Sequence, residues 1–386
     1  MKQKLFGKTG RELSILGFGC MRLPLLDQND AASIDYDLST SMIRKAIDRG
    51  VNYVDTAYPY HSRDRALPGE SELLVAWALK GGYREKVSVA TKLPTWLTQT
   101  HRDMDRFLDE QLKRLDVGPI DFYLAHNLNH GCWSRMKELG LNDFLDAALK
   151  DGRIKQAGFS FHDRYELFEE IIGGYDWSFA QIQLNYLDVD YQAGLRGLKL
   201  AHGRGLGVVV MEPLRGGFLV NHMPSELTRR LAEIRPQWSL ADWGLRWVWN
   251  QPEVGVVLSG MSAMSHVDGN LASADEAGPL TQEELTALDE ARQYFKERLQ
   301  VNCTSCGYCL PCPSGVNIPK NFSYYNDYFL VDSDVVRARA KYYYAAQCAA
   351  DENAENCVQC QECEAKCPQN LPISDLMPKA AATLRA

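Results

Sequence analysis

The sequence predicts an α/β fold, a (β/α)8 TIM barrel followed by a small, mostly helical C-terminal domain. Two observations favour this architecture. From residue 12 to about residue 290, apolar β-rich runs alternate with amphipathic helical stretches, and strands separated by helices indicate parallel βαβ units. Nine of the eleven cysteines fall in the last 84 residues, which marks a change in composition near the end of the barrel. We therefore predict domains at residues 1–295 and 296–386.

Eight runs have the composition of buried strands. They lie at residues 15–19, 51–56, 87–92, 122–126, 156–160, 180–184, 207–211 and 254–258. Helical patterns fall between them, for example at residues 39–49, 70–80, 102–115 and 142–150. Eight βα units over roughly 250–290 residues are what a TIM barrel requires.

A doubly wound sheet is the competing architecture. Such a sheet usually carries G-x-G-x-x-G after its first strand. Here Gly17-Phe18-Gly19-Cys20 is followed by Met21 and Arg22, so the fingerprint is incomplete and the barrel is favoured. Residues 281–299 predict a last helix with a Thr281-x-x-Glu284 capping box, which leads into the second domain.

Composition excludes some classes of function. The formal net charge is −8 and no basic run occurs, which argues against nucleic-acid binding because phosphate neutralisation needs clustered Lys and Arg. No apolar stretch approaches the ~20 residues of a membrane span, and the N-terminus lacks a signal-peptide core. We expect a cytoplasmic protein without a membrane partner, in which an odd number of cysteines argues against disulfides.

The cysteines form two closely spaced runs, each ending in Cys-Pro. The second run matches the bacterial ferredoxin pattern C-x2-C-x2-C-x3-C-P, and the first has one residue fewer before its last cysteine. In that pattern the fourth cysteine ligates the other cluster. We therefore predict two [4Fe–4S] clusters, one held by Cys303, Cys306, Cys309 and Cys367, the other by Cys312, Cys357, Cys360 and Cys363. The alternatives are two four-cysteine zinc sites, since C-x2-C pairs also bind zinc, or a disulfide scaffold.

Four polar residues lie at the ends of successive predicted strands, where barrel active sites are built. Asp55 and Tyr60 follow the second strand, Lys92 ends the third, and His126 ends the fourth. An ammonium beside a phenol stabilises its phenolate, so Lys92 would make Tyr60 a better general acid, with Asp55 orienting Lys92. His126 would position the substrate oxygen. Singly, these residues could be a structural ion pair and a core histidine.

This order and spacing resemble the catalytic tetrad of the aldo-keto reductase family. The resemblance runs from Leu5-Phe6-Gly7-Lys8-Thr9-Gly10 to Gln282-Glu283-Glu284-Leu285, and the cysteine module points to the iron–sulfur-containing group. It implies carbonyl–alcohol interconversion with NAD(P)H. Tyr58 is a rival to Tyr60, but the five-residue spacing from Asp55 selects Tyr60.

The same resemblance implies cofactor-binding positions. They are Ser160, Gln181, Met211, Pro213, Leu214, Arg215, Gly216, Gly260, Met261 and Asn270. Phe161 stands where the family usually has Asn, Met211 where an aromatic ring often stacks on nicotinamide, and no Arg occurs near His266 to bind a 2′-phosphate. The choice between NAD and NADP therefore stays open.

Nicotinamide transfers two electrons together, whereas each cluster transfers one, so coupling usually needs an intermediary such as a flavin. We expect either a flavin in the barrel or a redox partner protein that carries one. Two alternatives stay open: structural clusters, or an electron-transfer or adaptor protein whose barrel binds a nucleotide or flavin without turnover. The substrate is a small carbonyl or alcohol compound, and Trp96 and Trp133 either line its pocket or pack in the core.

Overall fold

The computed structural model describes residues 1–28, 30–331 and 333–385, and the chain divides into two compact units. The first unit comprises Met1–Pro213 and Gly244–Pro279. The second comprises Leu214–Trp243 and Leu280–Ala386. Residues 214–243 therefore group with the cysteine-rich region, although barrel strands precede and follow them in the sequence. The sequence-based boundary between residues 295 and 296 stays a prediction.

Eight parallel strands close into a barrel in the order β10-β3-β4-β5-β6-β7-β8-β9. These strands are β3 (Leu16–Gly19), β4 (Tyr53–Asp55), β5 (Ser88–Leu93), β6 (Phe122–Leu128), β7 (Ala157–Phe161), β8 (Phe179–Gln183), β9 (Gly207–Met211) and β10 (Val256–Ser259). Nearly every strand residue is buried, as expected for strands with side chains inside the barrel on one face and helices on the other. The predicted TIM barrel is confirmed, with each of the eight strands at its expected place.

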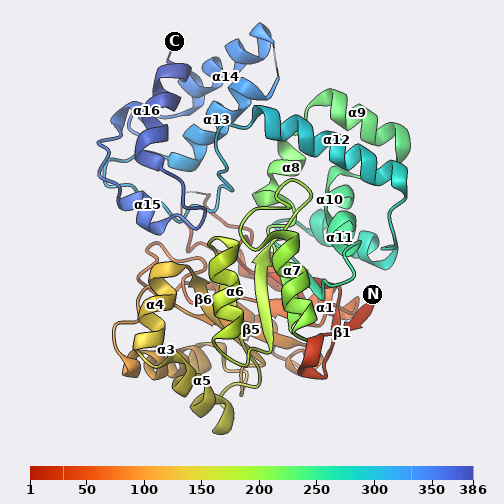
Figure 1. Cartoon of the computed structure of the whole chain (residues 1–386), viewed down its shortest axis with the longest axis vertical. Coiled ribbons are helices and arrows are strands. Elements are labelled where there is room, and N and C mark those ends of the chain that lie inside the picture. The colour runs from red at the N-terminus through yellow and green to blue at the C-terminus, as the bar shows by residue number, and fades with distance from the viewer. Residues whose placement is uncertain (29, 332, 386) are drawn as a thin grey trace. The chain divides into compact units, whose positions relative to one another are not determined.

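Helices follow the strands around the outside of the barrel (Figure 1). They are α1 (Tyr36–Asp48), α2 (Ser71–Ala78), α3 (His101–Leu115), α4 (His130–Glu138), α5 (Leu141–Lys150), α6 (Tyr165–Gly173), α7 (Gly194–Gly203), α10 (Leu240–Trp249) and α11 (Met264–Asp275). Helix α3 begins with a reciprocal capping box between Thr100 and Asp103, which satisfies amide groups left unpaired at a helix start.

An antiparallel hairpin of β1 (Gln3–Leu5) and β2 (Glu12–Ser14) precedes the barrel, and the sequence did not predict it. Phe6 follows β1 and is fully buried, with its ring 5.6 Å from that of Phe122 at an edge-to-face angle. Gly207 and Gly255 make room for this ring, because a Cβ on either glycine would lie only 2.5 or 2.6 Å from it. The hairpin thus places an aromatic ring against the strands of the barrel.

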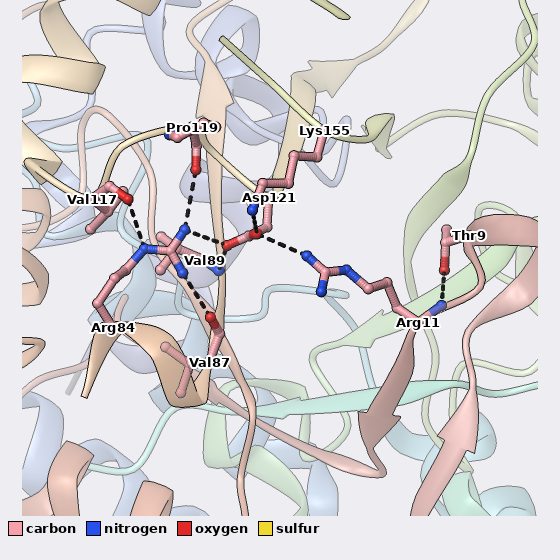
Figure 2. A network of polar contacts seen from close by, with 9 residues as sticks. All are labelled: Thr9, Arg11, Arg84, Val87, Val89, Val117, Pro119, Asp121 and Lys155. Carbon is pink, nitrogen blue, oxygen red and sulfur yellow. Dashed lines mark hydrogen bonds and ion pairs between the residues drawn. The ribbon is translucent and has the colours of Figure 1, made fainter. Parts of the chain in front are cut away.

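A polar network around Asp121 ties the hairpin, the β5 region and the β6 region together (Figure 2). The buried Asp121 carboxylate accepts hydrogen bonds from Arg11 (3.2 Å), Arg84 (2.8 Å) and Lys155 (2.8 Å). It also accepts one from the backbone N–H of Val89 (2.9 Å). A buried carboxylate with this many donors is well compensated for its lost hydration.

The second unit is helical. Its helices are α8 (Phe218–Asn221), α9 (Ser225–Ile234), α12 (Gln282–Arg298), α13 (Ile318–Leu330), α14 (Asp334–Gln347), α15 (Glu362–Lys366) and α16 (Ile373–Leu384). The capping box predicted for α12 is present, with Thr281 and Glu284 each bonding the other's backbone. Phe322, Met377 and Ala380 are among the fully buried side chains of its core. None of the helices in the described residues is long and apolar enough to cross a membrane.

Candidate active site and cysteine cavities

The barrel brings Asp55, Tyr60 and Lys92 into direct contact. Asp55 ends β4 and Lys92 lies near the end of the neighbouring strand β5. The Lys92 Nζ atom donates to Asp55 Oδ1 (2.6 Å), to the carbonyl of Thr56 (2.7 Å) and to Tyr60 Oη (3.3 Å). One ammonium group therefore contacts both the carboxylate and the phenol that the sequence singled out.

This ion pair is almost completely removed from water. The side chain of Lys92 is 0% exposed and that of Asp55 is 3% exposed. Burial raises the pKa of Asp55, while the charge and the hydrogen bond of Lys92 oppose that rise. Asp55 Oδ2 is buried and accepts no hydrogen bond from any described residue, so the carboxylate depends on Lys92 for its stabilisation.

The geometry distinguishes Tyr60 from Tyr58. The Tyr60 ring lies under the Lys92 ammonium, with Nζ 4.8 Å from the ring centroid. The Tyr58 ring instead packs edge-to-face on Phe107 of α3, at 5.2 Å. Tyr58 is thus held by the core, whereas Tyr60 faces the buried ion pair.

His126 lies in β6 next to these residues. Its ring is edge-to-face with Tyr60 at 6.1 Å and with Trp96 at 5.1 Å. Burial, and then the positive charges of Lys92 and Arg65, hold the pKa of His126 well below its ordinary value. The imidazole is therefore neutral at physiological pH, and a neutral imidazole can donate a hydrogen bond to a substrate oxygen through its N–H.

A buried network supports the strand that carries Lys92, and sequence reasoning missed it. Gln111 of α3 donates through Nε2 to the Lys92 carbonyl (3.0 Å) and to Glu72 Oε1 (2.8 Å). Thr91 also donates to Glu72 Oε1 (2.7 Å), and Arg114 to Glu72 Oε2 (3.1 Å). Burial raises the pKa of Glu72. A Gln on the apolar face of a predicted helix was the one signal for this network.

The two tryptophans differ in role. Trp133 is buried and donates through Nε1 to Glu170 (2.7 Å), so it packs between α4 and α6. Trp96 contacts His126 and lies at the site. From the sequence, each tryptophan could line the substrate pocket or pack in the core. In the structure, Trp133 packs in the core and Trp96 lies beside His126.

Three of the residues expected to bind cofactor lie on adjacent strands β7, β8 and β9. Ser160 Oγ accepts a hydrogen bond from the backbone N–H of Asn127 (2.7 Å). Gln181 donates through Nε2 to Met211 Sδ (3.6 Å). The Gln181 Oε1 atom is buried and has no hydrogen-bond partner within the described ranges. An orphaned amide oxygen of this kind fits a ligand that brings an N–H donor, such as a carboxamide.

The other residues expected to bind cofactor have different surroundings. Asn270 of α11 donates to Ser259 Oγ (2.7 Å), so part of its side chain is engaged in fixing the end of β10. Gly260 follows β10, with the side chain of Arg22 beside its Cα, and Met261 is buried. Pro213 is the last residue of its segment of the first unit.

Leu214, Arg215 and Gly216 belong to the second unit. Arg215 and Gly216 have positive φ angles of 50° and 64°. Arg215 is 1% exposed and donates to Asn302 Oδ1 at 2.6 Å, the residue before Cys303. This part of the expected pyrophosphate loop is therefore folded into the unit that carries the cysteine runs.

The eight cysteines of the two runs line two separate cavities. One cavity is bordered by Cys303, Cys306, Cys309 and Cys367, and the other by Cys312, Cys357, Cys360 and Cys363. Each cavity thus takes three cysteines from one run and the last cysteine of the other.

The cavity geometry differs from that of a single-ion site. Within the described residues, no three His, Cys, Asp or Glu side chains lie close enough to hold one metal ion. Backbone N–H groups point at the sulfurs, as in the bond from Ser305 N to Cys303 Sγ (3.4 Å). Ser305, Gln359 and Gln361 have positive φ angles, so the chain coils tightly between consecutive cysteines. Four cysteines around each cavity fit an iron–sulfur cubane, whose iron corners are held by cysteine thiolates.

Comparison with known proteins agrees with this geometry. Residues 15–293 match the aldo/keto reductase family, and residues 302–371 match the 4Fe-4S dicluster domain. The chain therefore belongs to the aldo/keto reductase family and is an oxidoreductase with a C-terminal iron–sulfur domain.

Individual relatives extend the comparison. The chain is 27% identical over 326 residues to "Probable aldo-keto reductase 1" of Glycine max, which covers 74% of this chain and 87% of that protein. It is 27% identical over 235 residues to "Uncharacterized oxidoreductase YrpG" of Bacillus subtilis (strain 168), covering 57% and 68%. The solved structure of aldo-keto reductase AKR11C1 from Bacillus halodurans, holo form, has a TM-score of 0.61 at 23% identity and covers 75% of this chain and 96% of that chain. That structural likeness shows the fold.

Proposed function

We propose that this protein interconverts a carbonyl and an alcohol with NAD(P)H at the Asp55–Tyr60–Lys92–His126 site, and that it links this reaction to electron transfer through two [4Fe–4S] clusters. One observation carries the first part of the proposal. The Lys92 ammonium contacts Asp55 Oδ1 at 2.6 Å and Tyr60 Oη at 3.3 Å, and the side chains of Lys92 and Asp55 are 0% and 3% exposed.

The proton chemistry follows from these contacts. NAD(P)H, when bound, supplies hydride to the carbonyl carbon, and Ser160, Gln181 and Met211 are the residues of the first unit that would hold its nicotinamide end. Tyr60 donates its phenolic proton to the carbonyl oxygen and becomes a phenolate, which the Lys92 ammonium stabilises. Asp55 keeps Lys92 charged and fixes its position. In the reverse direction the phenolate accepts the proton of the alcohol.

His126 contributes by orientation. Its neutral ring stands beside the Tyr60 ring, where an N–H can hold the carbonyl oxygen next to the phenol. A neutral histidine keeps its proton while donating this bond, so Tyr60 remains the group that transfers one. Its low pKa keeps the ring in this state across physiological pH.

The test is Tyr60→Phe, with Tyr58→Phe as the matched control. Removing a general acid should lower kcat by about 10²–10⁴-fold, while Tyr58→Phe should keep most of its activity. Cluster reduction by dithionite should be unchanged in both variants. Full turnover in Tyr60→Phe would remove this tyrosine from the mechanism, whereas a parent protein that reduces no carbonyl substrate would favour the adaptor alternative.

The cluster part of the proposal assigns four cysteines to each cavity. Cys303, Cys306, Cys309 and Cys367 would hold one cluster, and Cys312, Cys357, Cys360 and Cys363 the other; each cluster, when bound, supplies one-electron transfer. About eight iron and eight sulfide per chain are expected for two cubanes. Cys360→Ser should lower both contents, whereas Cys348→Ser, which removes a buried core thiol, should leave them unchanged. Zinc in place of iron and sulfide would overturn this assignment.

The link between the two centres is the third part. Hydride carries two electrons and a cluster accepts one, so the proposal includes a flavin, bound in the barrel or carried by a redox partner protein. An anaerobic titration with NADPH, followed at the cluster absorbance with and without added flavin, tests it. Bleaching would support a shared electron path, and an unchanged spectrum in both cases would leave the clusters as structural elements. The reducing environment that such clusters require fits the expected cytoplasmic location.

A further inference from the structure

The loop of residues 61–70 connects Tyr60 to α2 and is closed at its base. Gly69 N donates to the Tyr58 carbonyl (2.7 Å), and Ser71 N donates to the Tyr60 carbonyl (3.2 Å). At Gly69 a Cβ would lie 2.0 Å from the Tyr60 carbonyl oxygen, so glycine allows this close approach. The loop is therefore held in a defined position beside the proton donor.

Two arginines of this loop point in different directions. Arg63 forms a two-pronged ion pair with Asp30, at 2.9 and 2.6 Å, and its side chain is 73% exposed. Arg65 instead places its guanidinium over the ring of Trp96, 4.6 Å from the centroid. Arg63 thus forms a surface ion pair, whereas Arg65 contacts Trp96 at the site.

A continuous row of rings leads from Arg65 to the proton donor. Trp96 meets His126 edge-to-face at 5.1 Å, and His126 meets Tyr60 at 6.1 Å. Trp96 Nε1 and His126 Nδ1 are both buried, and neither has a hydrogen-bond partner in the parts of the chain that the structure describes. An indole N–H can only donate, and a buried donor without a partner indicates an acceptor that is supplied by a ligand.

The charges along this row are positive. Lys92 pairs with Asp55 at 2.6 Å, and after burial the charges of Lys92 and Arg65 both lower the pKa of His126. Burial, and then Arg65, hold the pKa of His162 at about 4. The two imidazoles are therefore neutral, and the guanidinium contributes a positive potential to this wall. An anionic group placed there would gain charge-assisted hydrogen bonds in a site of low dielectric.

We propose that the substrate carries a carboxylate, held by the Arg65 guanidinium and the Trp96 Nε1–H while its carbonyl oxygen lies at Tyr60. The substrate class is thus an oxo or hydroxy carboxylic acid rather than a neutral aldehyde or ketone. This inference rests on the proposed function, because it assigns a second anchoring point to the same site. Arg65 is a specificity-determining residue here, and Tyr60 remains the catalytic one.

The experiment compares two substrates of nearly the same shape, 4-carboxybenzaldehyde and its neutral methyl ester, with NADPH at fixed ionic strength. The parent protein should favour the carboxylate in kcat/KM by about tenfold or more, the range of a hydrogen bond to a charged group. Arg65→Gln should bring the ratio of kcat/KM for the carboxylate to kcat/KM for the ester close to one. Arg63→Gln is the matched control and should keep the preference, and Arg65→Lys should keep part of it.

A binding measurement keeps the two proposals distinguishable. Calorimetric titration with 4-(hydroxymethyl)benzoate and with the corresponding amide should show tighter binding of the acid, and the difference should disappear in Arg65→Gln. If the parent reduces both aldehydes without preference, and the acid and amide bind equally, the carboxylate site is wrong while the proposed reaction stands. If no aldehyde is reduced but the acid binds in an Arg65-dependent manner, the carboxylate site stands and the proposed reaction fails.

Discussion

Replacing Lys92 by Met is the most informative perturbation of the site. Methionine has a similar length but cannot donate, so the variant loses the bonds to Asp55, the Thr56 carbonyl and Tyr60. The Asp55 carboxylate is then left buried with no donor on either oxygen among the described residues. Two consequences follow, one for stability and one for turnover.

The loss of stability can be estimated from the burial of the pair. Removing one partner of a buried ion pair costs about 3–5 kcal/mol, because the remaining charge is uncompensated. Burial already raises the pKa of Asp55 in the parent, and losing Lys92 raises it further. The folded variant therefore holds a proton that the unfolded chain releases, so its stability falls as pH rises above the ordinary pKa of Asp.

The assay is urea-induced unfolding under anaerobic conditions, followed by circular dichroism at pH 5 and pH 7.5. Lys92→Met should be destabilised more at pH 7.5 than at pH 5. The double variant Lys92→Met/Asp55→Asn should recover part of the loss, because its buried amide costs less than an uncompensated buried carboxylate. Its turnover should stay about 10²–10⁴-fold below the parent, because the phenolate remains unsupported.

Two results would refute this reasoning. A Lys92→Met variant destabilised by less than about 1 kcal/mol would show that Asp55 finds water or another donor. A double variant that recovers both stability and turnover would mean that Tyr60 needs no adjacent ammonium.

Three further predictions concern stability away from Lys92. Asp121→Ala leaves three cations and the Val89 N–H without their shared acceptor, so denaturant unfolding should show a loss of about 3 kcal/mol; a loss no larger than that of the exposed Asp48→Ala control would contradict it. The pKa of His162 is about 4 instead of its ordinary 6.5, so the unfolded chain binds a proton that the native chain does not, and its contribution of about 3 kcal/mol is lost as pH falls from 6.5 to 4. His162→Gln should flatten that part of the stability–pH curve, and an unchanged slope would count against the low pKa. Thr100→Ala removes the cap of α3 and should cost about 1 kcal/mol in the same measurement, whereas Thr100→Ser should cost far less.

Strand positions could be predicted from the sequence because each barrel strand is a short apolar run followed by an amphipathic helix. The same regularity explains why the four polar residues meet. In a parallel barrel all strands end at one rim, so Asp55, Lys92 and His126, each near the end of its strand, had to lie near one another. Their positions follow from this topology, and their catalytic roles stay a proposal.

The sequence did not predict the features that depend on contacts between distant segments. The hairpin of β1 and β2 has three residues in each strand, too few for an alternating pattern to stand out. The support of Lys92 by Gln111 and Glu72 joins α2, α3 and β5 through side chains 19 to 39 positions apart. Periodicity reports which face of an element is buried, but not which polar group on that face finds a partner.

The assignment of residues 214–243 to a domain also depends on contacts between distant segments. Strand order assigns this segment to the barrel, since β9 precedes it and β10 follows it. Its contacts assign it to the cysteine-rich unit, where Arg215 bonds Asn302 and His222 bonds Asp327 at 2.8 Å. Neither pair has a local pattern that sequence could reveal, because the partners are 87 and 105 positions apart. The loop expected to cover the pyrophosphate is therefore built together with the segment that leads into Cys303, and a change at Asn302 reaches Arg215 through their hydrogen bond.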